Sequence, residues 1–161
     1  MPRRRTALII AVPEAEPYVA ELRLAHDSSA PLGVPAHITI LFPFAAADEV
    51  DEEALEAVIG AHAAFAFDLA TVEHFGDDVT YLAPVPAEPF VELTRAVEAR
   101  WPQYPPYEGL HDDPIPHLTV GECRLELALP LPLACRAEDV LLIEEKAPGG
   151  QWLVRRRFPL R

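Results

Sequence analysis

The chain has 161 residues, of which half are hydrophobic and 24% are charged, and its mean hydropathy is +0.09. This composition excludes a disordered or fibrous chain and predicts one compact domain, spanning residues 1–161, with a sizeable core. The net charge of −13 disfavours extended duplex nucleic acid as a partner, because a long phosphate backbone requires several cationic contacts.

Hydrophobic periodicity predicts the elements of the first half of the chain. An apolar run predicts a strand over 6–12, and the apolar spacing after Pro17 predicts a helix over 16–25. Residues 27–35 are rich in Ser, Pro and Gly and are expected to form a loop before a strand over 36–42. This half is completed by a helix over 51–63 with Asp48 as its N-cap, and by strands over 65–69 and 79–85.

The second half repeats the order of helix, loop and strand. A helix is predicted over 88–101, and a proline-rich loop over 102–116 leads into a strand over 116–121. A short helical turn, a strand over 136–145 and a final strand over 151–158 are expected to follow. The repetition indicates an internal duplication and an α+β fold of two pseudo-symmetric lobes. The lobes are expected to comprise roughly residues 1–85 and 86–161, and strands could be exchanged between them.

Charge is distributed unevenly along the chain. All acidic residues lie between Glu14 and Glu145, whereas about half of the basic residues lie near the termini. Those residues are Arg3, Arg4, Arg5, Arg155, Arg156, Arg157 and Arg161. They would form one basic patch if the chain ends paired in space, but solvated charges at strand ends are the simpler interpretation.

Two segments of nearly equal sequence carry the strongest chemical signal: PAHITI at 35–40 and PIPHLTV at 114–120. Side chains alternate along a strand, so His37 and Thr39 share one face, and His117 and Thr119 do the same. An imidazole exchanges a proton near neutral pH, and a hydroxyl donates to an anionic oxygen. One such pair alone would indicate only the polar face of a sheet. Two matched pairs, 80 residues apart, predict a cradle for a phosphate.

These motifs resemble the His-x-Thr/Ser-x signature of the two-histidine (2H) phosphoesterase superfamily. More narrowly, the chain is similar to bacterial 2′-5′ RNA ligase and RNA 2′,3′-cyclic phosphodiesterase proteins, and the similarity includes the flanking residues 33–36 and 41–44 and the ending at 152–160. The resemblance implies antiparallel sheets around a central cleft, metal-independent chemistry and no cofactor.

The four motif side chains are the predicted catalytic residues. Opening a 2′,3′-cyclic phosphate requires a base for the attacking water and an acid for the departing ribose oxygen. The resemblance implies His117 as the base and His37 as the acid in hydrolysis to a 2′-phosphate, with the roles exchanged in ligation. Thr39 and Thr119 would hydrogen-bond the non-bridging oxygens, where charge accumulates in the transition state.

Candidate substrate-binding residues flank the motifs. Four aromatic residues are candidates to stack on a base: Phe42, Phe44, Tyr81 and Tyr107. Tyr107 lies in the loop before the second motif. The apolar neighbours of Phe42 and Phe44 favour the core instead. Many relatives carry an arginine soon after the second motif, and the nearest arginine here is Arg124, which follows three intervening residues.

Other reactive side chains give weaker signals. Cys123 and Cys135 form neither a zinc pattern nor a disulfide framework, which predicts a reduced, cytoplasmic protein. The apolar run at 6–12 is too short for a signal peptide or a membrane span, so no membrane partner is expected. His111 lies in the long loop, where it could line the cleft or remain at the surface.

The sequence therefore predicts a monomeric enzyme that acts, without metal or cofactor, on a small nucleotide or an RNA end bearing a cyclic phosphate. Two alternatives stay open. One is 2′-5′ ligation or hydrolysis of another 2′-phosphoester, and the other is a non-catalytic nucleotide-binding module that keeps the same cradle.

Overall fold

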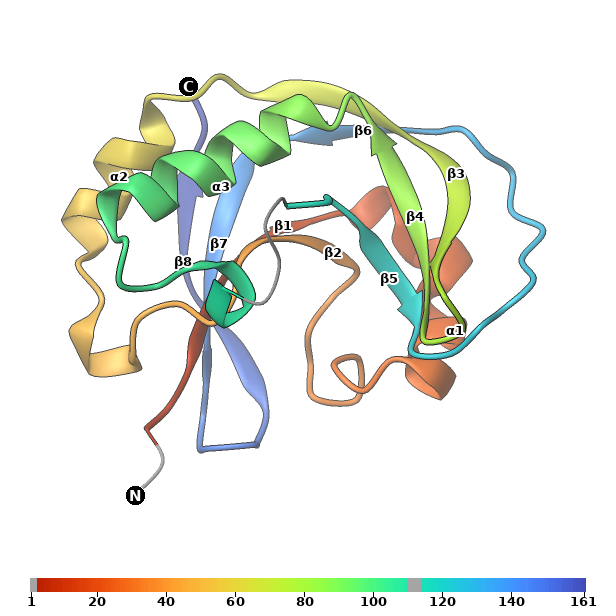
Figure 1. The fold of residues 1–161 in the computed structure, drawn as a ribbon, viewed down its shortest axis with the longest axis horizontal. Coiled ribbons are helices and arrows are strands. Elements are labelled where there is room, and N and C mark those ends of the chain that lie inside the picture. The colour runs from red at the N-terminus through yellow and green to blue at the C-terminus, as the bar shows by residue number, and fades with distance from the viewer. Residues whose placement is uncertain (1–2, 110–113) are drawn as a thin grey trace.

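Two four-stranded antiparallel sheets form the frame of the protein in a computed structural model, which describes residues 3–109 and 114–161 (Figure 1). The strands and α-helices are β1 (Thr6–Ala11), α1 (Glu16–His26), β2 (His37–Leu41), α2 (Glu52–Gly60), β3 (Phe65–Phe75), β4 (Val79–Val85), α3 (Glu88–Arg100), β5 (Leu118–Gly121), β6 (Leu133–Ala137), β7 (Asp139–Glu145) and β8 (Trp152–Pro159). Short 3₁₀ helices are η1 (Pro13–Ala15), η2 (Ala47–Glu49) and η3 (Pro106–Gly109). The predicted α+β fold class is confirmed.

The two sheets do not follow the halves of the chain. The first has the strand order β2-β1-β7-β8 and the second has the order β5-β4-β3-β6. Each sheet thus combines two strands from residues 1–85 with two from residues 86–161.

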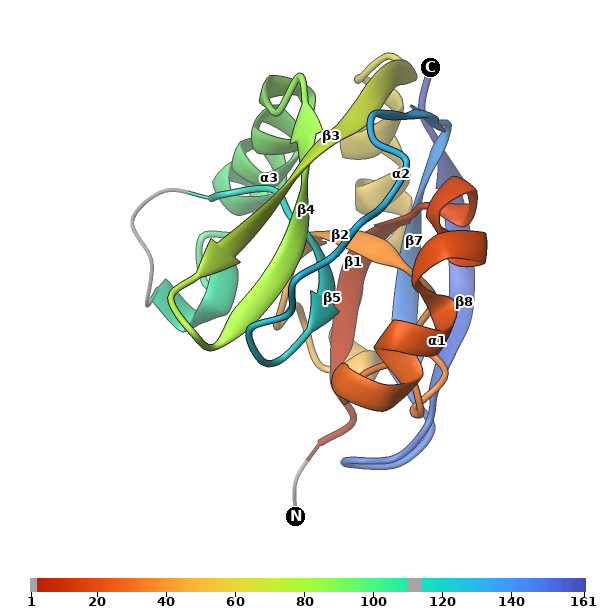
Figure 2. The ribbon, with the colours of Figure 1, turned by 90° about the vertical axis from the view of Figure 1, so that its right-hand side faces the viewer.

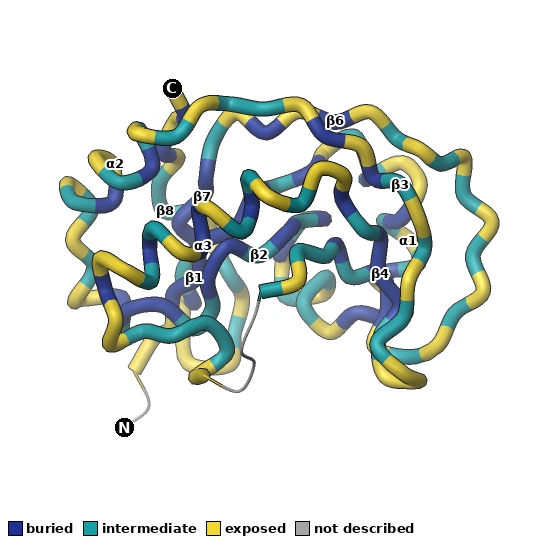
Figure 3. The backbone as a smooth tube through the Cα atoms, turned by 45° about the horizontal axis from the view of Figure 1, so that its top comes forward, coloured by how far each residue is buried: buried dark blue, intermediate teal, exposed yellow. Residues whose placement is uncertain are grey.

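The central strands of the first sheet, β1 and β7, are largely apolar and are buried on both faces (Figure 3). Leu8 and Ile10 of β1 point into the main core, whereas Ala7 and Ile9 belong to a smaller cluster on the other face. This double burial explains why residues 6–12 form a continuous apolar run rather than an alternating one.

Helices cover the sheets on several sides (Figures 1 and 2). α3 packs against β2, α2 packs against β8, and α1 packs against β5. The spacing of Phe90, Leu93 and Val97 predicted the buried stripe of α3, and all three are at most 1% exposed. Within the described residues, no helix has the length and apolar character needed to cross a lipid bilayer.

The two histidine motifs lie on β2 and at the start of β5, which are edge strands of different sheets and contact each other (Figure 1). Ile38 and Leu118 are fully buried, whereas the histidine and threonine of each motif are only partly buried. The alternation of faces predicted for both motifs is therefore confirmed. The fold brings the two polar faces together from positions far apart in the sequence.

Two predicted details of the first half are wrong. The N-cap of α2 is Asp51, whose carboxylate accepts a hydrogen bond from the Ala54 N–H at 3.0 Å, whereas Asp48 lies in η2 and pairs with Arg3. β3 continues to Phe75 because it forms a long hairpin with β4, although its outer half lacks a strong apolar signal.

The predicted strand over 136–145 is two strands. β6 pairs with β3 as far as Ala137, and β7 pairs with β1 and β8 from Asp139, so the chain crosses between sheets at Glu138. The short helical turn expected before this strand is also wrong, because residues 124–132 take no regular secondary structure. No glycine or proline lies between Leu133 and Glu145 to mark the change of sheet.

In the described part of the chain, six of the seven terminal arginines, all except Arg161, lie in ion pairs with carboxylates rather than in one basic patch. Arg5 pairs with the fully buried Glu145 at 3.0 Å, and Arg155 pairs with Glu52 at 2.9 Å. Further pairs are Arg3–Glu49, Arg4–Glu144, Arg156–Glu56 and Arg157–Asp139. These contacts neutralise much of the positive charge that the termini carry.

Candidate active site

The two motif histidines are held in the same way. His37 Nδ1 lies 2.7 Å from the carbonyl oxygen of Pro35, and His117 Nδ1 lies 2.6 Å from that of Ile115. Because a carbonyl oxygen only accepts, Nδ1 of each ring carries the proton that it donates. Nε2 is then the nitrogen at which each ring can accept or release a further proton. Each ring is therefore set for proton transfer through the same atom.

The environment of His37 favours its neutral form. Burial lowers the pKa of His37 to about 4, and the nearby charges of Arg23 and His117 act in the same direction. The hydrogen bond to Pro35 and the charge of Asp27 oppose this lowering of the pKa. The charge of His117 acts on His37 and strand β2 contacts β5, so the two imidazoles lie near each other.

Tyr107 reaches this site from η3. Its hydroxyl shares a hydrogen bond with the side chain of Thr39, and burial raises the pKa of the phenol more than this bond lowers it. The backbone N–H of Tyr107 donates to the carbonyl of Phe42 at 2.7 Å. Tyr107 and Glu108 have φ values of 50° and 57°, a region that non-glycine residues rarely occupy. Strained backbone of this kind is concentrated at functional sites.

An aromatic pair supports the ring of His117. Phe75 and Tyr81 stack with their centroids 4.3 Å apart, and both meet the imidazole edge-on, at 5.2 and 5.6 Å. Tyr81 also lies opposite Thr119 in the pairing of β4 with β5. The sequence named Tyr81 only as a stacking candidate and did not identify Phe75, because the predicted strand ended before it.

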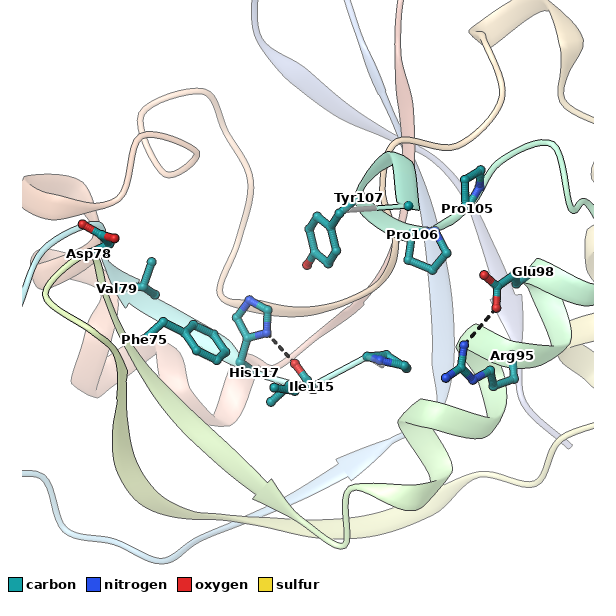
Figure 4. A pocket seen from close by; sticks show the side chains of 12 residues that line it. Phe75, Asp78, Val79, Arg95, Glu98, Pro105, Pro106, Tyr107, Ile115 and His117 are labelled. Carbon is teal, nitrogen blue, oxygen red and sulfur yellow. Dashed lines mark hydrogen bonds and ion pairs between the residues drawn. The ribbon is translucent and has the colours of Figure 1, made fainter. Parts of the chain in front are cut away.

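A pocket of about 490 Å³ opens beside His117 (Figure 4). Phe75 and His117 line one side and Tyr107 lines another, while Arg95 and Glu98 of α3 contribute an ion pair of 3.1 Å. This volume suits a small organic ligand, and the lining combines apolar walls with a few polar groups. No sequence signal identified Arg95 and Glu98, because a charged pair at this spacing is ordinary on an exposed helix.

Two predicted substrate-binding side chains lie outside the lining of this pocket. Phe42 packs against Trp152, and the guanidinium of Arg5 lies over its ring. Arg124 donates to the Gly76 carbonyl at 3.3 Å and is half exposed. His111, the other candidate for the cleft, lies outside the described residues.

Side chains of the types that bind metals do not cluster in the described part of the chain. β5 ends at Gly121, and Cys123 lies beyond it with its Sγ 3.8 Å from His26 Nδ1. In residues 3–109 and 114–161, no three His, Cys, Asp or Glu side chains gather closely enough to hold a metal ion.

Comparison with known proteins identifies the family and the fold of the chain. Residues 11–156 match the sequence profile of the 2′-5′ RNA ligase superfamily, whereas no curated protein sequence matches the chain. Escherichia coli LigT complexed with 3′-AMP has a similar fold, with a TM-score of 0.69 at 16% identity over 99% of each chain. The same protein complexed with NADP⁺ gives 0.68 at 17% identity, also over 99% of each chain.

A third solved structure, TT0787 of Thermus thermophilus, gives a TM-score of 0.62 at 21% identity over 98% of each chain. The profile covers most of the chain, and the structural likeness covers nearly all of it. The chain therefore belongs to the 2′-5′ RNA ligase superfamily of two-histidine phosphoesterases.

Proposed function

We propose that this protein hydrolyses 2′,3′-cyclic phosphates of nucleotides or RNA ends to 2′-phosphates. The observation that carries the proposal is the matched setting of His37 and His117. Both rings donate from Nδ1 to the carbonyl two residues earlier, which directs the chemistry of both to Nε2. A pair of imidazoles in one site supplies the acid and the base that this reaction requires.

In the proposed mechanism, water attacks the phosphorus in line with the departing 3′-oxygen. His117 accepts the proton of the water as the new P–O bond forms, and His37 donates its Nε2 proton to the 3′-oxygen as the old bond breaks. Thr39 and Thr119 hydrogen-bond the non-bridging oxygens. Exchange of protons with solvent then restores both rings.

His37 must gain a proton before it can act as the acid. Its pKa of about 4 keeps it neutral at pH 7 in the ligand-free protein. A bound phosphate places negative charge beside the ring and raises this pKa. Bound phosphate therefore favours the protonated form of His37, which is the form that the proposed acid requires.

The size and polarity of the pocket support a small nucleotide as substrate. Its volume of about 490 Å³ and its aromatic wall at Phe75 suit one nucleoside beside the phosphate. The structures of E. coli LigT with 3′-AMP, NADP⁺ and ATP are complexes of a related fold with small nucleotides. The net charge of −13 disfavours long polyanions as ligands.

The test is incubation of the protein with 2′,3′-cyclic nucleotides in the presence of EDTA, followed by identification of the products. We expect a 2′-phosphate, and a loss of at least about 100-fold in kcat for His37→Ala and for His117→Ala. His62→Ala, which removes a histidine just beyond α2 and outside both motifs, is the matched control and should retain activity.

Other outcomes distinguish the alternatives. A 2′-5′-linked product from suitable RNA ends would assign ligation, and binding without turnover would assign a nucleotide-binding module. Hydrolysis that survives both histidine substitutions, or that EDTA abolishes, would overturn the proposed mechanism.

A further inference from the structure

One peptide group connects the ring of His37 to a carboxylate. The carbonyl of Pro35 accepts from His37 Nδ1 at 2.7 Å, and the N–H at the other end of the same peptide, on Ala36, donates to Glu16 Oε1 at 2.6 Å. Ala36 is fully buried, so solvent does not compete for its N–H. Hydrogen bonds in such a chain polarise one another, and electron density from Glu16 strengthens the acceptor that holds the imidazole.

The same stretch of backbone is anchored by a second side chain of α1. Arg23 is 2% exposed, and its Nη2 donates to the carbonyl of Val34 at 3.0 Å. Its Nε donates to Asp27 at 3.1 Å, and its Nη1 lies 3.9 Å from Glu16 Oε1. Side chains of α1 thus hold the connecting peptide through the Ala36 N–H and the preceding peptide through the Val34 carbonyl.

The second motif has no equivalent of this connection. His117 Nδ1 is held by the carbonyl of Ile115, and the next residue is Pro116. Proline has no backbone N–H, so no carboxylate can be joined to that ring through the peptide. The two histidines share the same hydrogen bond from Nδ1 to a backbone carbonyl, but only the peptide that holds His37 also bonds to a carboxylate.

We propose that Glu16 is a positioning residue for His37, acting through the Pro35–Ala36 peptide to fix its Nδ1–H form and to favour its charged state. The charged and titratable groups that face His37 are then Arg23 and Asp27 from α1 and the turn after it, and His117 from the facing strand. The catalytic consequence rests on the proposed function, because only an acid that must be protonated benefits from this support.

The experiment is an NMR titration of the two imidazoles in Glu16→Gln, with Glu21→Gln as the control. Glutamine keeps an acceptor oxygen for the Ala36 N–H but removes the charge. Glu21 is an exposed acid on the same helix, so its substitution changes the net charge equally. We expect Glu16→Gln to lower the pKa of His37 by about 0.5, a threefold change in proton affinity, and to leave His117 unchanged.

A second variant separates an effect through the peptide from one through space. Ala36→Pro removes the N–H and copies Pro116 of the second motif, which holds its ring in the same way. In this background Glu16→Gln should no longer move the His37 titration. An unchanged His37 titration in Glu16→Gln alone, or equal shifts of both histidines, would overturn the proposal.

Kinetics add a separate readout. With a cyclic nucleotide, kcat of Glu16→Gln should fall by about threefold, in step with the titration, and Glu21→Gln should match the unsubstituted protein. If the unsubstituted protein shows no turnover, the proposed function fails. The titrations in the ligand-free protein still decide the role of Glu16 in that case.

Discussion

His37 titrates well below the usual range of a histidine, since burial lowers its pKa to about 4. Below the normal pKa of about 6.5 an unfolded histidine takes up a proton, whereas the folded one does so only near pH 4. The unfolded state therefore binds more protons between these values. Stability contributed by His37 is complete above pH 6.5 and is lost as the pH falls toward 4.

This linkage predicts a pH-dependent difference between the protein and His37→Gln. The free energy of unfolding, measured by urea denaturation, should favour the unsubstituted protein increasingly as the pH rises from about 4 to 6.5, with no further change above. Comparing the two proteins cancels the titration of carboxylates elsewhere. A difference that stays constant across this range would contradict the low pKa of His37.

At this scale the sequence predicted the alternating faces of the motifs, because strand periodicity is local. It did not predict the partners of His117 and Tyr107. Phe75 reaches the imidazole only because β3 and β4 form a long hairpin, and the bond between Tyr107 and Thr39 depends on how η3 folds back. Contacts of this kind arise from assembly and leave no local pattern.

Among the elements, β5 is placed by close contact with α1. A Cβ atom at Gly121 would lie 2.8 Å from Leu125 Cδ1 and 2.9 Å from the Cβ of His26. The Glu122 N–H donates to the His26 carbonyl at 2.7 Å, which fixes the same junction. Glycine at the end of β5 therefore permits the approach that sets the position of the second motif.

Gly121→Ala should consequently destabilise the protein by about 1–3 kcal/mol, as overpacking does in other tightly packed sites. It should also lower kcat, because the displaced β5 carries His117 with it. Gly60→Ala is the matched control, since nothing lies within 4 Å of the added methyl group. Thermal unfolding and turnover measurements on both variants test this prediction. Equal stability and equal kcat in the two variants would contradict it, because the contact between β5 and α1 would then accommodate the methyl group without cost.

The elements themselves were predictable wherever the hydrophobic period was strong, as in α3 and β4, whose bounds nearly match the expected ones. The crossing at Glu138 was not, because no glycine or proline interrupts the sequence there, although β6 and β7 join different sheets. Periodicity reports which face of a strand is buried. It does not report the sheet to which the strand belongs.

For the molecule as a whole, the acidic surface governs which ligands approach. The terminal arginines are engaged by carboxylates such as Glu145 and Glu52, so they offset little of the repulsion felt by a nucleic acid. Repulsion grows with the number of phosphates on the ligand, whereas a single cyclic nucleotide carries one charge. Salt screens this repulsion over a Debye length of about 10 Å at 0.1 M.

We therefore expect added salt to improve the use of long RNA substrates. Between about 0.05 and 0.5 M salt, KM for an RNA strand with a 2′,3′-cyclic end should fall, and KM for a cyclic mononucleotide should change little. Proteins that bind nucleic acid through cationic contacts show the opposite trend. A KM that rises with salt for the longer substrate would indicate a basic track on this surface.

The meeting of β2 with β5 has a mechanical consequence. No ladder of backbone hydrogen bonds joins these two strands in the described part of the chain, so the gap between the imidazoles depends on how one sheet is tilted against the other. An anion bound from both edges would add a direct link between two motif strands that share no backbone ladder of their own. Binding of an anion should therefore restrict the motion of one sheet against the other, and this motion should be larger when the site is empty.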